Sequence, residues 1–127
     1  MRFLPTVLLV LLAACGIHRV ELGWRELHNT STLYAVPPEY ALWWQNIVDE
    51  CDCIPVVDLS TVSWNRVNRP VFDCIAAVEC HGVYIPSLAE AFIASGDTLR
   101  EAVVKHEMRH AILGGDAGHE HPLWRFD

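Results

Sequence analysis

The chain has 127 residues, of which 52% are hydrophobic and 20% are charged, and its formal net charge is −7. This length suits one small domain with a single core and leaves no room for a second. The excess of carboxylates argues against nucleic acid or anionic lipid as a binding partner, because both carry negative charge.

The first residues predict an export signal. A short positive start is followed by the apolar run Val7–Leu12, which is too short to span a membrane. The stretch Leu12–Cys15 resembles the bacterial lipobox, which implies a signal peptide over residues 1–14 and a lipid on Cys15. By the same resemblance, Gly16 favours the outer membrane of the cell envelope, facing the periplasm. The alternative is an ordinary signal peptide that happens to contain a cysteine.

Residues 15–37 are predicted to be an irregular tether between the lipid and the domain, because no periodic pattern runs through them. The domain itself is expected over residues 38–127. A first helix is predicted for Glu39–Asp49, since Pro38 suits a first helical position and apolar residues recur there at helical spacing.

Short extended segments follow this helix. Thr61–Val67 alternates with period two, and Gly82–Pro86 is a brief strand closed by a proline. Val71–His81 fits a loop or the flank of a hairpin, and Leu88–Ala94 fits a strand better than a helix. The predicted fold class is α+β, with a short antiparallel or mixed sheet, an N-terminal helix and a later helix that carries the candidate site.

Four cysteines lie beyond the signal, at Cys51, Cys53, Cys74 and Cys80. An even number in a short exported chain favours disulfides. The Cys51-x-Cys53 pair does not easily close on itself, so we expect it to cross to Cys74 and Cys80, although the sequence leaves the pairing open. A cysteine-based zinc site is the alternative.

The later helix is predicted from Thr98-x-x-Glu101, a capping-box signature, to Leu113, with Gly114–Gly115 as the stop. One sector of the helix carries both histidines among apolar residues. A second apolar sector lies roughly opposite, and Lys105 and Arg109 are expected to mark the solvent edge. A helix of this kind is wedged between layers.

This helix contains His106-Glu107-x-x-His110, the zinc peptidase signature. Residues four apart lie on one face of a helix, so His106 and His110 can bind one zinc ion at about 2.0–2.1 Å each. The carboxylate of Glu107 is placed to take a proton from a water on the metal. The alternative is that the motif arises by chance and the histidines are structural.

The third ligand must come from the C-terminal residues, because too little chain follows His110 for a second helix with a distant glutamate. The metzincin pattern also fails, since Leu113 and Asp116 stand where it needs glycine and histidine. In an extended tail, alternate side chains project to the same side. The remaining candidates are Asp116, His119, Glu120 and His121.

Several short motifs occur along the chain. They are Trp43 with its helix, Ser63–Trp64, Cys74…Cys80-x-Gly82-x-Tyr84, His106-Glu107-Met108-x-His110 and the terminal Gly-x-x-His-Pro. Together these motifs resemble a group of small exported bacterial proteins assigned as zinc metallopeptidases with a zincin-like fold. The resemblance covers about residues 40–124 and implies that the His-Pro pair His121–Pro122 supplies the third ligand. The inserted His119–Glu120 departs from that pattern and makes His119 a rival.

These features predict a zinc-dependent hydrolase, most simply a peptidase acting on peptides or proteins, monomeric and anchored to the membrane through Cys15. Glu107 is the expected general base, and Tyr84, His81 or His119 could stabilise the oxyanion. The alternative is a non-catalytic metal-binding or interaction lipoprotein with a structural zinc, in which His119 and His121 both coordinate. A degenerate, purely binding form is a weaker third reading, because Glu107 is present.

Overall fold

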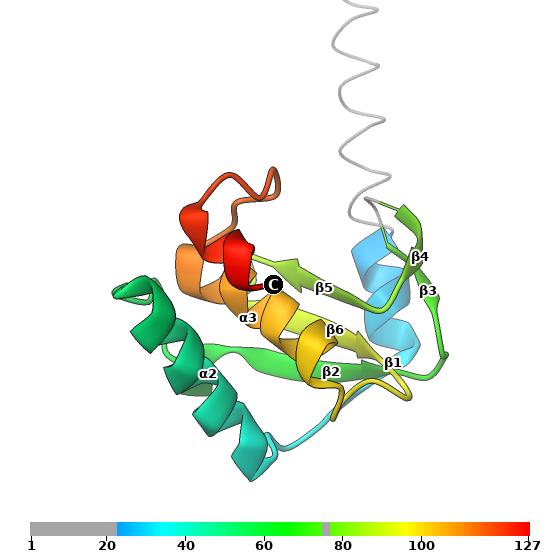
Figure 1. Cartoon of the computed structure of the whole chain (residues 1–127). Helices are drawn as coiled ribbons and strands as arrows, with labels where there is room; N and C mark the ends of the chain where they lie inside the picture. Colours follow the sequence, from blue (N-terminus) through cyan, green and yellow to red (C-terminus); the bar gives the residue numbers. More distant parts are fainter. Residues whose placement is uncertain (1–22, 75–76) are drawn as a thin grey trace, which may run out of the picture.

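The computed structural model describes residues 23–74 and 77–127 (Figure 1). The predicted signal peptide and the lipidation site Cys15 lie outside this part of the chain. Within the described part, none of the helices has the length and apolar character needed to cross a membrane.

A four-stranded mixed sheet forms the centre of the domain, with strand order β1-β2-β6-β5 (Figure 1). β2 and β6 run parallel, and the other neighbours are antiparallel. The three predicted strands are confirmed with shorter bounds, and the α+β class is confirmed with them. The strands of this sheet are β1 (Ser31–Leu33), β2 (Ser63–Val67), β5 (Gly82–Ile85) and β6 (Glu90–Ala94).

Two helices cover one face of the sheet, and smaller elements cover the other. α2 (Pro38–Cys51) and α3 (Glu101–Leu113) pack over Trp64, Ala91 and Ile93 in the larger core. A helix at residues 23–29 and the hairpin of β3 (Phe72–Cys74) and β4 (Ala77–Cys80) complete a second core around Phe92. Successive residues of β6 therefore point into different cores, as a strand requires. The 3₁₀ helices η1 (Leu59–Thr61) and η2 (Pro122–Phe126) complete the fold.

The prediction of an irregular tether up to residue 37 is wrong for residues 23–33. The helix at 23–29 buries Leu27, and β1 pairs with β2 at the edge of the sheet. These elements are stabilised by contacts with strands distant in the sequence, so local periodicity does not predict them.

The predicted capping box is also wrong, because α3 begins only at Glu101 and Arg100 occupies the N-cap without a side-chain hydrogen bond. Thr98 lies in the preceding turn, where its carbonyl accepts a hydrogen bond of 2.6 Å from the Tyr40 hydroxyl. Arg109 is not at the solvent edge either: it is 2% exposed and pairs with Asp127.

The cysteines pair locally as Cys51–Cys53 and Cys74–Cys80, so the expected crossing between the two groups is wrong. Antiparallel pairing of β3 with β4 brings the Cα atoms of Cys74 and Cys80 to 5.9 Å. Asp52 adopts a left-handed conformation at the end of α2, with φ 49°, and the flanking Cα atoms lie 5.1 Å apart. Both separations fall within the usual range for disulfides.

Candidate metal centre

Helix α3 is held firmly against the core by the apolar sector opposite its histidines. Four side chains of that sector are no more than 1% exposed, namely Val104, Met108, Ala111 and Ile112. His106 and His110, on the other side, are only half-buried. The second apolar sector is therefore confirmed as the buried face of α3. The expectation that the histidine pair lies within an apolar stripe is wrong, because Leu99 and Ala102 are exposed and Val103 and Leu113 are only partly buried.

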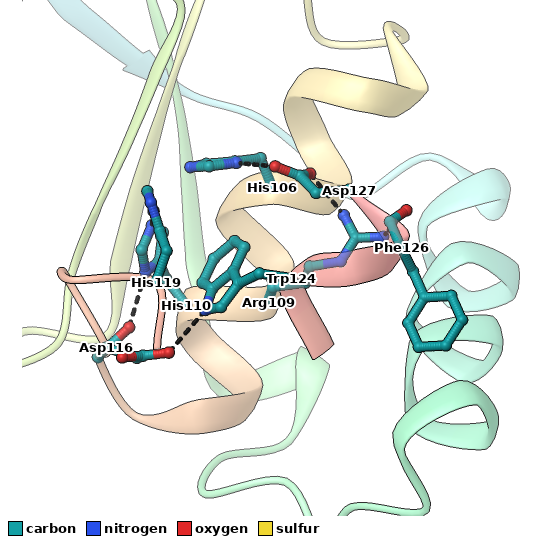
Figure 2. A network of polar contacts seen from close by, with 9 residues as sticks. His106, Arg109, His110, Asp116, His119, Trp124, Phe126 and Asp127 are labelled. Carbon is teal, nitrogen blue, oxygen red and sulfur yellow. Dashed lines mark hydrogen bonds and ion pairs between the residues drawn. The ribbon is translucent and has the colours of Figure 1, made fainter. Parts of the chain in front are cut away.

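Three imidazoles converge at this face, from His106 and His110 on α3 and from His119 in the loop after it (Figure 2). One ligand atom from each lies within 4.8 Å of the others. The Nε2 atoms of His110 and His119 are 3.2 Å apart. Two nitrogens bound to one tetrahedral zinc at the usual distance would be separated by about 3.3 Å. The three imidazoles could therefore hold a metal ion.

Hydrogen bonds to the outer ring nitrogens orient both helical histidines. Nδ1 of His106 donates to a carboxylate oxygen of Asp127 at 2.7 Å, and Nδ1 of His110 donates to the carbonyl of Gly115 at 2.7 Å. With Nδ1 carrying the proton, Nε2 of each ring presents a lone pair that a metal can bind. Such outer bonds fix ring orientation and raise ligand basicity in metal sites.

Arg109 supports this arrangement from within the protein. Its guanidinium donates to the second carboxylate oxygen of Asp127 at 2.9 Å and to the carbonyl of Phe126 at 3.0 Å (Figure 2). Asp127 therefore links a buried cation to the ring of His106. Sequence reasoning missed Asp127, because no local pattern connects it to a helix that starts 26 residues earlier.

The pKa of His110 is lowered, first by burial and then by the neighbouring His106 and His119, against opposing contributions from Gly115 and Asp116. A lowered pKa favours the neutral ring, and the neutral ring is the form that binds metal.

The structure places the rival His119, and not His121, beside the helical pair. Nδ1 of His121 accepts a hydrogen bond of 3.0 Å from the backbone N–H of Leu123 at the start of η2. The carboxylate of Asp116 is occupied by donors of the same loop and of η2. The expected extended tail does not form, because Asp116 and His119 take left-handed conformations with φ 59° and 52°.

Trp124 is a further residue of the site that the sequence did not reveal. The centroid of its ring system lies 5.0 Å from His106, 4.6 Å from His110 and 4.2 Å from His119. Its indole N–H donates to Asp116 at 2.6 Å. The only sequence signal was a tryptophan shortly after the histidine-rich stretch, and its position did not indicate that the side chain would point toward the histidines.

Glu107 is 3% exposed and packs against the start of β5. A Cβ atom placed on Gly82 would come within 2.9 Å of both the Cγ and an oxygen of Glu107, so only glycine leaves the carboxylate its present position. Burial raises the pKa of Glu107 to about 8, and the negative charge of Asp127 adds to the rise.

The site opens into a cleft with two adjoining hollows. One hollow, of about 300 Å³, is walled by Tyr84, Pro86, Ala117 and the Cys74–Cys80 disulfide. The other, of about 420 Å³, is lined by Glu79, His81, Val103 and Asp127. The two share Cys80, Gly82, His106 and Glu107, which therefore lie where the hollows meet.

His81 faces the second hollow with its ring oriented by a buried acid. Its Nδ1 donates to the carboxylate of Asp97 at 2.7 Å, and Asp97 is 8% exposed. The side chain of His81 remains 48% exposed, so the ring can meet a bound molecule.

Comparison with known proteins gives no relative for this chain: no family model, no curated protein and no solved structure matches it. What the site can do therefore follows from its own chemistry.

Proposed function

We propose that this protein is a zinc-dependent hydrolase in which His106, His110 and His119 hold the metal. The observation that carries the proposal is the convergence of three imidazoles beside the buried carboxylate of Glu107. Imidazole nitrogens suit zinc among the divalent metals, and three protein ligands are typical of catalytic zinc sites.

The number of ligands favours catalysis over a structural zinc. A structural site has four protein ligands and leaves no position for water. A structural zinc site would need both His119 and His121 as ligands. Among the described residues, the cluster of possible metal ligands consists of His106, His110 and His119 and does not include His121. The Nδ1 of His121 is engaged at the start of η2. Three protein ligands would leave one position for water or substrate.

A zinc ion bound there would act as a Lewis acid and bring the pKa of a water molecule to about 7. Glu107 would take the proton from that water and pass it to the leaving amine. Tyr84, which lines the cleft, would donate a hydrogen bond to the substrate carbonyl as negative charge builds on its oxygen, and burial raises the pKa of Tyr84 and keeps its hydroxyl protonated. His81 would donate to the carbonyl only as an imidazolium, because its Nδ1–H is already bonded to Asp97.

A peptide or protein is the substrate class that suits the shape of the cleft. Among the described strands, β5 pairs only with β6, so its other edge is open, and its residues Gly82, Val83 and Tyr84 line the cleft. An extended peptide can add to such an edge through backbone hydrogen bonds. This arrangement agrees with the zincin-like resemblance of the sequence.

We further propose that the enzyme acts at the periplasmic face of the outer membrane, as a monomer held by a lipid on Cys15. This part of the proposal is supported by the lipobox-like stretch before Cys15 in the sequence.

Metal analysis together with a peptide-cleavage assay tests the proposal. We expect one zinc per chain, lost in His106→Ala, His110→Ala and His119→Ala. Glu107→Gln should keep the zinc and lose hydrolysis, because it removes only the proton acceptor. Hydrolysis by the Glu107→Gln variant would refute the mechanism. A spectrum of the cobalt-substituted protein that is typical of four nitrogen ligands would favour the structural alternative.

A further inference from the structure

The loop between α3 and η2 is organised around one side chain, Asp116. One carboxylate oxygen accepts the backbone N–H of Glu120 at 3.1 Å. The other accepts the backbone N–H of His121 at 3.0 Å and the indole N–H of Trp124 at 2.6 Å. Hydrogen bonds to an ionised acceptor are about twice as strong as neutral ones, so these contacts define the path of the loop.

These contacts decide which histidine faces α3. The backbone carbonyl of Asp116 also accepts the N–H of His119 at 3.0 Å, which closes a tight turn. From this turn the ring of His119 reaches His110, with 3.2 Å between their Nε2 atoms. The N–H of His121 is drawn back to the carboxylate, and its ring takes the N–H of Leu123.

Trp124 connects the same carboxylate to the three imidazoles. Its indole N–H is bonded to Asp116, while its ring contacts His119, His110 and His106 (Figure 2). Because the indole N–H and the ring belong to one side chain, the hydrogen bond to Asp116 also fixes the ring surface that the three imidazoles contact.

We propose that Asp116 is a positioning residue that selects His119, rather than His121, as the third metal-binding nitrogen, and that it does so together with Trp124. The proposal rests on the metal site proposed above but not on hydrolysis.

The state of the Asp116 carboxylate agrees with this role. Its pKa is lowered to about 2, by the N–H of His121 first, then by Trp124 and Glu120. The side chain is therefore an anion throughout the pH range in which histidines bind metal.

Zinc affinity, measured by competition with a chromophoric chelator, tests the proposal on the full chain. Asp116→Ala should weaken binding by about 10- to 100-fold, the usual effect of losing an outer partner of a metal ligand. Asp116→Asn keeps one acceptor oxygen and should recover part of the loss. Trp124→Phe keeps a ring but removes the N–H, so its effect should not add to that of Asp116→Ala.

A change of ligand gives the sharper readout. In the natural background, His121→Ala should leave zinc affinity unchanged within about twofold and His119→Ala should abolish tight binding. In the Asp116→Ala background, His121→Ala should become costly, because neither histidine is then selected. Glu120→Ala, an exposed neighbour whose side chain takes no part in the loop contacts, is the matched control and should bind zinc as the natural chain does.

The outcomes separate this inference from the proposed function. Unchanged affinity in both Asp116→Ala and Trp124→Phe, with unfolding curves like those of the natural chain, would overturn the positioning role while leaving the metal site intact. If Asp116→Ala does not fold, the decision rests on Asp116→Asn and Trp124→Phe. A natural chain that binds zinc but cleaves no peptide would leave the inference standing and refute hydrolysis. A natural chain that binds no zinc would overturn both.

Discussion

The buried carboxyl of Glu107 gives a prediction that needs no substrate. Without metal, folding transfers this group from water to a site where it is 3% exposed and where Asp127 adds negative charge, and its pKa rises to about 8. Glu107→Gln keeps the shape of the side chain and removes the ionisation. The substitution should therefore change how the stability of the metal-free protein depends on pH.

The size and sign of the effect follow from linkage. An acid whose pKa is raised on folding binds its proton more tightly in the folded state, so its stabilising contribution is complete below the unfolded pKa of about 4.5 and is lost as pH rises to about 8. At about 1.4 kcal/mol per unit of pKa, the loss approaches 5 kcal/mol as an upper bound. Glu107→Gln should match the natural protein near pH 4.5 and become progressively more stable than it toward pH 8.

Urea unfolding in the presence of a chelator, at steps between pH 5 and pH 9, measures the difference. Glu50→Gln, on the exposed side of α2, is the matched control and should keep the pH dependence of the natural protein. Excess zinc should shrink the difference, because a nearby cation favours the carboxylate. A free-energy difference between Glu107→Gln and the natural protein that is the same at pH 5 and pH 9 would refute the reasoning.

Three further substitutions probe the packing around the site. Gly82→Ala places a methyl group 2.9 Å from the side chain of Glu107. We expect the free energy of unfolding in urea to fall by about 1–3 kcal/mol and hydrolysis to be reduced. An unchanged midpoint of the urea transition would show that the carboxylate moves freely. Met108→Ala empties a position that is fully buried between α3 and the sheet, and it should cost about 2–5 kcal/mol in the same assay, whereas Leu42→Ala on the exposed face of α2 should cost little. Tyr40→Phe removes the hydroxyl that donates to the carbonyl of Thr98 and is bonded to the hydroxyl of Tyr34, and the free energy of unfolding should fall by at least about 1 kcal/mol. No fall would mean that these two bonds do not stabilise the turn before α3.

Much of the fold could be predicted from periodicity. α2 buries its apolar face as expected, and His106 and His110 lie on one face of α3 because residues four apart must do so. β2 and β5 form where strands are predicted, although both of their faces are covered. These elements are specified by their own sequences.

The features that the sequence did not predict depend on distant partners. The strand β1 exists because β2 offers an edge, and the Cys74–Cys80 pairing follows from the β3–β4 hairpin. The choice between His119 and His121 depends on the side-chain bonds of Asp116, which turn the tail back instead of leaving it extended. Sequence periodicity does not predict contacts between side chains that are distant in the sequence.

The two residues between Glu107 and His110 should tolerate few substitutions. Met108 is fully buried in the core, and Arg109 is 2% exposed with its charge balanced by Asp127. Positions that are free in the general motif are therefore restricted in this fold. A library randomised at both and selected for folded protein should return apolar residues at 108 and keep arginine at 109. The motif is thus part of the domain's architecture as well as its chemistry.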